Sequence, residues 1–272
     1  MIPAAFDYKT AASADEALSL LTEYGDDAKI LAGGHSLLPL MKLRLAQPQV
    51  LIDIGEVHDL SYVEDRGDHL AVGALTCHRD VEQSDVLTAQ LPVLAHAAAH
   101  VGDPQVRNRG TLGGSLVHGD PASDLPAVAL AADASMVIRS ASGDRLVAAS
   151  DFFTGFLETA VGPDELLVEV RFPTAPGVGW GFEKFNRRAQ DWAIVGAAVL
   201  GGPSGGVALV NMGSRPELSA EATALLRNGG GPAEVAAAAA DAADPPDDIH
   251  ADAAYRSHLA RVLVERAVAG LT

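Results

Sequence analysis

The first of two similar stretches of this sequence reads Ala32-Gly33-Gly34-His35-Ser36-Leu37, and the second reads Thr111-Leu112-Gly113-Gly114-Ser115. In each of them two adjacent glycines are followed closely by a serine. Adjacent glycines can adopt positive φ angles, so that successive backbone N–H groups point to one side and form a nest for an anion. A serine hydroxyl adds a neutral donor. Two such nests facing each other predict a clamp for a diphosphate that needs no Lys or Arg.

The residues around the first stretch predict a small β-α-β unit, which we take as residues 1–56. Ser13-Ala14-Asp15-Glu16 is a capping box that opens a helix ending near Gly25. Apolar residues over 29–32 and 50–54 predict one strand before the first glycine stretch and one after it. Ser36 is predicted to be the N-cap of a short helix over 37–45, whose positive end would favour an anion.

The rest of the chain divides at Pro173-Thr174-Ala175-Pro176-Gly177, a proline- and glycine-rich linker pattern. Before it, residues 57–173 form a second unit with predicted hairpins and several short helices. After it, residues 178–272 form a third unit, in which three antiparallel strands precede three helices. The predicted strands cover 179–185, 193–200 and 207–212, and the helices cover 219–226, 233–242 and 253–269. The fold class is therefore α+β, in three pieces.

A simpler interpretation of the glycine pairs stands beside the nest. Each pair alone is more often only a turn, because glycine is common in turns. The pairing of two such stretches is what favours a binding site. Neither matches another known phosphate loop, since the sequence has no G-x-x-x-x-G-K-[ST] and no G-x-G-x-x-G that opens a helix after a strand.

The composition excludes several functional classes. Lys plus Arg number 19 and Asp plus Glu number 36, a formal net charge of −17, so we expect no binding to nucleic acid or to an anionic membrane. Cys77 is the only cysteine, so the chain cannot supply the four thiolates of an iron–sulfur cluster. His96 and His100 have helical spacing, but Ala97 stands where a general base would be, so we expect no metal site. Without a signal sequence or a membrane-spanning run, we expect a cytoplasmic protein.

Three segments carry a resemblance to a known family. They are AGGHSLLPLMKLRLAQPQVLIDIG over 32–55, TLGGSLVHGDPASDLPA over 111–127 and FEKFNRRAQDWA over 182–193. The chain resembles the FAD-binding medium subunits of the xanthine dehydrogenase, or molybdenum hydroxylase, family, and it is most similar to those of aerobic carbon monoxide dehydrogenases. The resemblance runs over nearly the whole sequence.

The resemblance implies a fold and a cofactor. The fold is the FAD-binding fold of the PCMH, or vanillyl-alcohol oxidase-like, type in two α/β subdomains. A C-terminal domain of a three-stranded antiparallel sheet with a helical bundle follows. FAD is the only cofactor expected on this chain, because molybdopterin and the iron–sulfur clusters are expected on partner subunits.

The resemblance also implies site residues. In the family both glycine stretches bind the FAD diphosphate. Asp124 resembles the acidic residue near the sugar and linker, and Leu167 resembles a position near the adenine. Lys184, Asp191 and Trp192 resemble residues near the isoalloxazine edge, where the lysine would stabilise a reduced flavin by its charge. Without the resemblance, Asp124 could equally be a helix N-cap, Lys184 a solvated strand residue and Trp192 a core or interface aromatic.

The function that follows is that of a redox subunit. The chain is expected to receive electrons from an iron–sulfur small subunit, which takes them from a molybdopterin large subunit, and to pass them to a quinone or NAD. The assembly implied is a dimer of heterotrimers. Two alternatives stay open: the flavin subunit of another hydroxylase, acting on aldehydes, purines or heteroaromatic compounds, and a non-redox module that binds FAD or another nucleotide.

Overall fold

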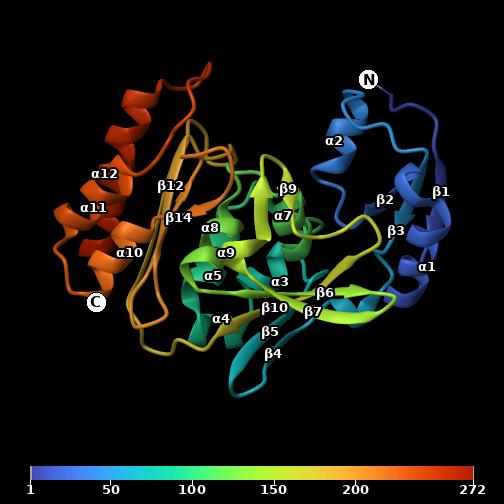
Figure 1. Ribbon diagram of the computed structural model, residues 1–272, viewed down its shortest axis with the longest axis horizontal. Coiled ribbons are helices and arrows are strands. Elements are labelled where there is room, and N and C mark those ends of the chain that lie inside the picture. Colours follow the sequence, from blue (N-terminus) through green and yellow to red (C-terminus); the bar gives the residue numbers. More distant parts are fainter. Residues whose placement is uncertain (1, 272) are drawn as a thin grey trace.

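The computed structural model describes residues 2–271 and shows three parts that follow one another along the molecule in chain order. In Figure 1 the N-terminal part lies on the right, the middle part at the centre and the C-terminal part on the left. Each part is built on a β-sheet of its own, and three clusters of buried apolar side chains hold the layers together.

The N-terminal part is a parallel sheet of three strands in the order β1-β3-β2. Its helix α1 begins as the capping box predicts: the Glu16 N–H donates to Ser13 Oγ at 3.1 Å, and the Ala12 N–H donates to the Glu16 carboxylate at 2.8 Å. Strand β1 carries mostly exposed side chains, so no apolar run marks it in the sequence. The elements are β1 (Asp7–Thr10), α1 (Ala14–Tyr24), β2 (Ala28–Leu31), α2 (Leu37–Lys42) and β3 (Val50–Asp53).

The middle part is an antiparallel sheet of five strands in the order β4-β5-β10-β6-β7. The central strand, β10, is buried along most of its length because it is covered on both faces. Leu167 and Val170 pack into the helical layer of the middle part, and Val168 packs toward α1. The strands are β4 (Val63–Asp65), β5 (His69–Gly73), β6 (Ser135–Ser140), β7 (Gly143–Ala148) and β10 (Leu166–Pro173).

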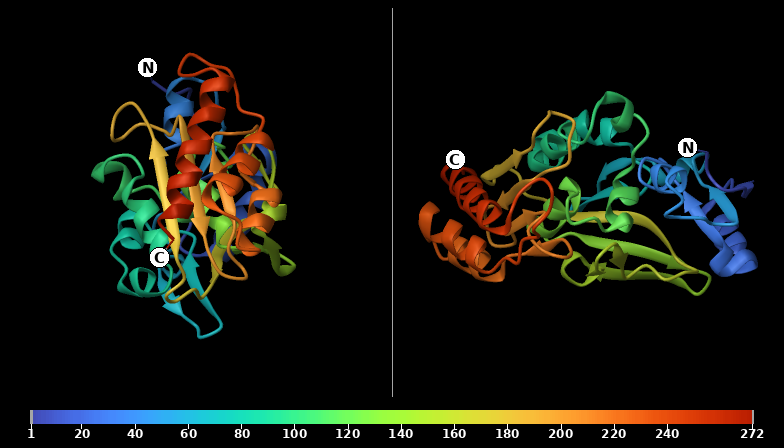
Figure 2. Two further views of the ribbon diagram at one scale, coloured as in Figure 1. Left: turned by 90° about the vertical axis from the view of Figure 1, so that its left-hand side faces the viewer. Right: turned by 90° about the horizontal axis from the view of Figure 1, so that it is seen from above.

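Short helices and one small hairpin form the second layer of the middle part (Figures 1 and 2). Helix α8 is buried at every position, because the middle helices lie on one side of it and the C-terminal sheet on the other. The elements are α3 (His78–Glu82), α4 (Asp85–Gln90), α5 (Pro92–Ala99), α6 (Pro104–Arg107), α7 (Leu112–His118), α8 (Asp124–Ala131), α9 (Ala149–Phe152), β8 (Phe153–Gly155) and β9 (Glu158–Thr159).

The C-terminal part is an antiparallel sheet in the order β11-β12-β13-β14. The sequence predicts three strands here, and the structure adds a fourth, because Glu217 and Leu218 pair with β13 although two residues are too short to give a pattern. One face of this sheet meets α8 and the other is covered by three helices (Figure 2). The elements are β11 (Trp180–Phe185), β12 (Val195–Leu200), β13 (Val207–Val210), β14 (Glu217–Leu218), α10 (Ala220–Arg227), α11 (Pro232–Asp241) and α12 (Ala253–Ala269).

A fully buried arginine ties α12 to the start of β12. The Arg256 guanidinium donates to the Ile194 carbonyl and to Asp248 Oδ2, the latter at 2.7 Å. Ile194 also accepts a hydrogen bond from the Asn211 side chain. This network fixes the backbone directly after Trp192, which lines the cleft described below.

Replacing Arg256 by Met should lower the free energy of unfolding by about 2–3 kcal/mol, because the buried carbonyl and the carboxylate lose their partner. The matched control is Arg261→Met, which removes a surface arginine of the same helix that pairs with Asp241 and should cost less than about 1 kcal/mol. Urea unfolding of both variants at neutral pH measures the difference. Equal losses would contradict the structural role of Arg256.

Candidate functional site

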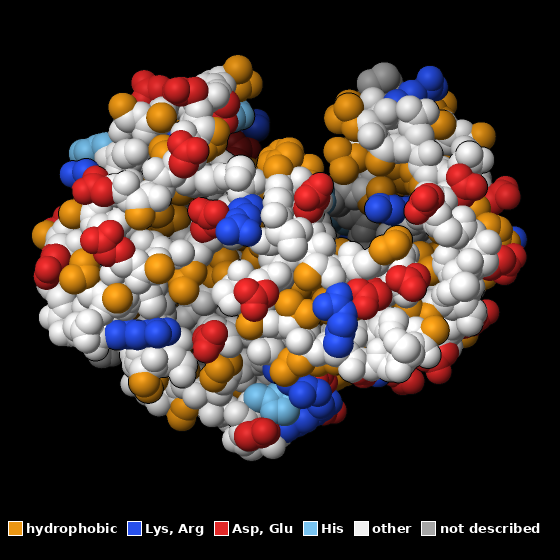
Figure 3. Space-filling model, in the orientation of Figure 1, with side chains coloured by type: hydrophobic (Ala, Val, Ile, Leu, Met, Phe, Trp, Pro, Cys, Tyr) orange, Lys and Arg blue, Asp and Glu red, His pale blue; other side chains and the backbone are white. Residues whose placement is uncertain are grey.

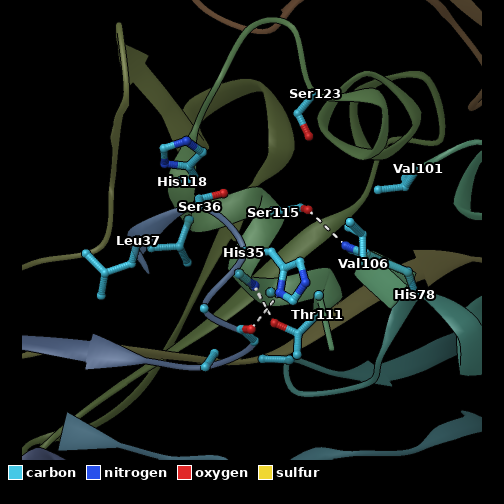
Figure 4. A pocket seen from close by; sticks show the side chains of 18 of the residues that line it. His35, Ser36, Leu37, His78, Val101, Val106, Thr111, Ser115, His118 and Ser123 are labelled. Atoms are coloured by element: carbon cyan, nitrogen blue, oxygen red, sulfur yellow. Dashed lines mark hydrogen bonds between the residues drawn. The ribbon is translucent and has the colours of Figure 1, made fainter. Parts of the chain in front are cut away.

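A cleft of about 500 Å³ lies where the three parts of the chain meet. This volume is in the range of small-molecule sites. Figure 3 shows this face of the molecule hollowed beside the N-terminal part, and Figure 4 shows some of the lining side chains. Of the residues that the sequence singles out, the cleft is lined by Ala32, Gly33, Gly34, His35, Ser36, Leu37, Thr111, Gly113, Gly114, Ser115, Asp124, Leu167, Lys184, Asp191 and Trp192.

The first glycine stretch presents unpaired backbone donors to the cleft. No acceptor among residues 2–271 takes a hydrogen bond from the N–H groups of residues 33–37. Gly34 has a φ of +76°, which L side chains rarely adopt, and this turns the chain sharply after β2. His35 shapes the same loop, since its Nδ1 lies 2.9 Å from the Gly33 carbonyl oxygen. The loop is therefore an open nest, as the sequence predicts for this stretch.

Helix α2 contributes less to the nest than the sequence suggests. It spans Leu37–Lys42 and not 37–45, and Ser36 lies in the αR region and makes no side-chain cap hydrogen bond. Ser36 therefore holds the predicted N-cap position, but its side chain does not cap the helix. The Ser36 hydroxyl is left available to the cleft, and the dipole of a six-residue helix is small.

The second glycine stretch does not form the predicted nest. It forms the N-cap and first turn of α7, and the N–H groups of residues 112–115 are already used within the chain. Gly113 donates to the Ala74 carbonyl at 2.9 Å and Gly114 donates to Thr111 Oγ1 at 3.1 Å. Leu112 donates to the Thr76 carbonyl at 2.9 Å, and its side chain is fully buried in the core and does not line the cleft. What this stretch offers the cleft is chiefly the hydroxyl of Ser115.

Glycine is needed at both stretches because the backbones approach closely. A Cβ on Gly33 would lie 2.1 Å from the Arg109 carbonyl oxygen and 2.8 Å from the Gly110 Cα. A Cβ on Gly113 would lie 2.7 Å from the Ala74 carbonyl oxygen. The first contact places the nest directly against the residues that lead into Thr111, so the two stretches meet at one end of the cleft.

A buried ion pair also lines the cleft. Lys184 Nζ, on β11, donates to Asp124 Oδ2 at 2.7 Å and to the His100 carbonyl oxygen at 3.0 Å. Both charged side chains are almost fully buried. Burial raises the pKa of Asp124, although the neighbouring ammonium acts in the opposite direction. The lysine charge is therefore neutralised by Asp124, and the cleft meets an ion pair and not the free cation that the sequence suggests.

One atom of this pair lacks a partner. Asp124 Oδ1 is buried and accepts no hydrogen bond from any described residue, although the side chain lines the cleft. Asp124 is the first residue of α8 and Ser123 holds the N-cap position, so the alternative in which Asp124 is the N-cap is wrong. An unpaired carboxylate oxygen next to a cleft fits a ligand that carries hydroxyl donors.

The remaining predicted residues surround the same cleft. Leu167 lies on β10 and is nearly fully buried, whereas the Trp192 side chain is half exposed at the mouth. Asp191 is held by Arg188 at 3.0 Å, which lowers the pKa of the Asp191 carboxyl. An exposed indole beside a cleft can cover a flat ring by stacking.

Sequence reasoning missed several lining residues. His78 is the first residue of α3, is buried and lies 3.3 Å from Ser115 through its Nε2. Burial, with smaller electrostatic effects of the nearby His35 and Arg107, lowers the pKa of His78 to about 4. His118 and Ser123 also line the cleft. His118 and Ser123 lie within the segment 111–127 that carries the family resemblance, but no local motif marks His78, because its place in the site depends on contacts between distant segments.

The cleft fits FAD on the residues present. A run of free N–H groups suits a diphosphate, the unpaired Asp124 oxygen suits the hydroxyls of a sugar or ribityl chain, and an indole at the mouth suits a planar ring. Gly33 and Gly34 are positions where a side chain would disturb the cradle. Within residues 2–271 no cluster of three metal-binding side chains occurs, and no helix is long and apolar enough to cross a membrane.

Comparison with known proteins agrees with this fit. Residues 4–175 match the model of the FAD binding domain in molybdopterin dehydrogenase, and residues 180–271 match that of the CO dehydrogenase flavoprotein C-terminal domain. The chain is 43% identical to the carbon monoxide dehydrogenase medium chain of Hydrogenophaga pseudoflava, covering 98% of this chain and 97% of the relative.

Two further comparisons extend this likeness. A solved structure of carbon monoxide dehydrogenase from Hydrogenophaga pseudoflava contains a chain that matches with a TM-score of 0.96 at 41% identity, covering 100% of this chain and 98% of that one. The 6-hydroxypseudooxynicotine dehydrogenase complex subunit alpha of Paenarthrobacter nicotinovorans is 40% identical, with coverage of 99% and 95%.

Replacing Gly33 by Ala should weaken FAD binding about tenfold to a hundredfold. The new methyl group would overlap the Arg109 carbonyl and displace the nest, at a cost of about 1–3 kcal/mol. Fluorescence titration with FAD measures the dissociation constant. Gly231→Ala is the control, because its Cβ would meet nothing within 4 Å and should leave the constant unchanged. An unchanged constant in the Gly33 variant would contradict the nest.

Acidification should destabilise the fold through His78. The pKa of His78 is lowered from 6.5 to about 4 in the folded chain, so the unfolded chain takes up the proton first as the pH falls. The contribution is therefore fully present above about pH 6.5 and is lost between about pH 6.5 and 4, to a total of about 3 kcal/mol.

Urea unfolding of His78→Gln as a function of pH measures this contribution. In this variant the free energy of unfolding should no longer fall between about pH 6.5 and 4 to the extent that His78 causes. His58 is exposed, so the His58→Gln variant should keep the pH dependence of the wild-type chain. An identical pH profile in His78→Gln and the wild-type chain would contradict the burial of a neutral imidazole.

Proposed function

The chain belongs to the family of FAD-binding subunits of molybdopterin dehydrogenases, and from this premise we propose that it is the flavin subunit of a molybdenum hydroxylase of the carbon monoxide dehydrogenase type. Its task is to relay electrons from the iron–sulfur clusters of a partner subunit to an external acceptor. Bound FAD supplies the exchange between one-electron and two-electron transfer that such a relay requires. The observation that carries the proposal is the run of free N–H groups over residues 33–37 in a cleft that is also lined by Asp124, whose Oδ1 is unpaired.

Within this proposal, different residues of the cleft bind different parts of the cofactor. The N–H groups of residues 33–37 and the Ser115 hydroxyl hold the diphosphate. Asp124 Oδ1 accepts a hydrogen bond from a hydroxyl of the sugar or ribityl chain, and Leu167 packs near the adenine. The Lys184 ammonium holds Asp124 in place, and Trp192 with Asp191 lies at the isoalloxazine edge. The support is the shared cleft, together with the resemblance of these positions to the family.

The type of hydroxylase rests on the relatives. The carbon monoxide dehydrogenase medium chain is 43% identical and the subunit of a dehydrogenase of 6-hydroxypseudooxynicotine is 40% identical. We therefore keep a heteroaromatic hydroxylase as the second candidate. Both candidates use this chain in the same way, because the substrate would be oxidised on the large subunit.

The partners belong to the same proposal. A relative described as a medium chain is one chain of a larger enzyme, and this chain has a single cysteine, so iron–sulfur clusters must lie elsewhere. We propose a small iron–sulfur subunit, a large molybdopterin subunit and a dimer of such heterotrimers, located in the cytoplasm. A quinone or NAD would be the acceptor.

The test isolates the chain through an affinity tag from the cells that produce it. The preparation should show two flavin absorption bands near about 375 and 450 nm. Heat should release FAD and not FMN, because the nest is expected to hold a diphosphate. Iron should co-purify with a smaller partner chain, and molybdenum should co-purify with a larger one.

Substrate addition then separates the two candidates. Under anaerobic conditions carbon monoxide should bleach the flavin absorption of the complex if the carbon monoxide dehydrogenase type is right. Bleaching by an N-heterocycle but not by carbon monoxide would favour the second candidate. A colourless complex without flavin would overturn the proposed function.

A further inference from the structure

His78 is buried and packs against the backbone that leads into the second glycine stretch. Its backbone N–H donates to the Gly110 carbonyl at 2.9 Å, and only 2% of the residue is exposed. The ring packs against the backbone of Gly110, where a Cβ would lie 2.8 Å from the imidazole Cδ2. Gly110 directly precedes Thr111, so the ring is held at the base of α7.

The ring makes one side-chain hydrogen bond, and it points to the cleft. His78 Nε2 lies 3.3 Å from Ser115 Oγ, shown by a dashed line in Figure 4. His78 Nδ1 is buried and has no partner among residues 2–271. Ser115 is half-buried and lines the cleft. The imidazole therefore contacts a side-chain donor of the second stretch that lines the cleft.

The unpaired nitrogen decides which way this hydrogen bond runs. At neutral pH the imidazole carries one proton, because burial lowers its pKa to about 4. A proton on Nδ1 would bury a donor without an acceptor, which is rare in native structures, whereas a proton on Nε2 leaves only a lone pair unused. The Nε2–H tautomer is the one favoured, and it donates to Ser115 Oγ.

The direction matters for an anion in the cleft. A serine hydroxyl has one proton and two lone pairs and rotates to suit its surroundings. If the imidazole accepted the serine proton, the serine would turn its lone pairs toward the diphosphate and repel it. When the imidazole donates, the serine proton is free to point into the cleft.

We propose that His78 is a positioning residue for the cofactor: its Nε2–H donates to Ser115 Oγ and so commits the serine hydroxyl to donate to the diphosphate of FAD. The inference rests on the proposed function, and it assigns to a buried histidine outside both glycine stretches a part in holding the cofactor. Because the N–H groups of residues 112–115 are used by the carbonyls of residues 74 and 76 and by Thr111, the Ser115 hydroxyl is a donor of that stretch which remains for the diphosphate.

A double-mutant cycle on the full-length chain tests the inference. Ser115→Ala and His78→Leu should each raise the FAD dissociation constant about tenfold, the size of one charge-assisted hydrogen bond. The double variant should bind no more weakly than Ser115→Ala alone, since the two residues act through one hydroxyl. Ser123→Ala is the control, because Ser123 lines the cleft without contacting His78, and its effect should add to that of His78→Leu.

Two conservative variants separate this role from simple packing. The side-chain nitrogen of His78→Gln can reach the place of Nε2 and donate to Ser115, so FAD binding should stay within about twofold of the wild-type value. The amide of His78→Asn reaches only the place of Nδ1 and should behave like Leu. This pair keeps the test valid if His78→Leu fails to fold.

The outcomes separate the inference from the proposed function. Additive losses for positions 78 and 115, or equal binding by the Gln and Asn variants, would overturn the inference while the wild-type chain still retains FAD. A wild-type chain that binds no FAD would overturn the proposed function and this inference with it. Non-additive losses with rescue by Gln would establish the hydrogen bond as the link.

Discussion

The structure depends on a close approach of two backbones, that of Gly33 against Arg109 and Gly110. It is the contact that joins the parallel sheet of the N-terminal part to the helical layer of the middle part beside the cleft. Because a side chain at residue 33 would lie 2.1 Å from a carbonyl oxygen, the loop cannot be placed there with any residue but glycine. The same approach leaves the N–H groups of residues 33–37 facing the cleft, without acceptors from the chain.

A second constraint sets the other wall. The ion pair of Asp124 and Lys184 joins α8 to β11, and so fixes the C-terminal part against the middle part. Two buried charges are costly to desolvate, and a pair of this kind is weak evidence for stability by itself. Its geometry is better explained by the cleft: the lysine satisfies one carboxylate oxygen and leaves the other for a ligand.

The parts of the fold that local sequence predicts are those that local forces determine. The capping box of α1 and the last helix follow from side chains within one or two turns of each other. Strands β1 and β14 escaped prediction because four mostly exposed residues and two residues give no period, and pairing with another strand defines them. The resemblance over the whole chain supplied the fold class and the cofactor, but it did not supply these two strands.

The features of the site differ in the same way in how far local sequence predicts them. The loop geometry of the first glycine stretch agrees with the prediction, because a positive φ at Gly34 and an open loop are local properties. The second was wrong in its geometry, since the carbonyls of Ala74 and Thr76 take N–H groups that a local reading assigns to an anion. His78 gave no signal at all, because its importance lies in its distance to Ser115 and in its burial.

The chemistry of the cleft explains how a chain with a formal net charge of −17 can hold an anionic cofactor. Lys184 is paired with Asp124, so its charge is not available to the diphosphate. Backbone N–H groups and serine hydroxyls bind through dipoles, which act over a short range and are not cancelled by acidic residues elsewhere on the surface. Such donors must be aimed before the ligand arrives, because their strength depends on direction. The sharp turn at Gly34 orients the N–H groups of the first stretch. The buried imidazole of His78 orients the Ser115 hydroxyl of the second stretch.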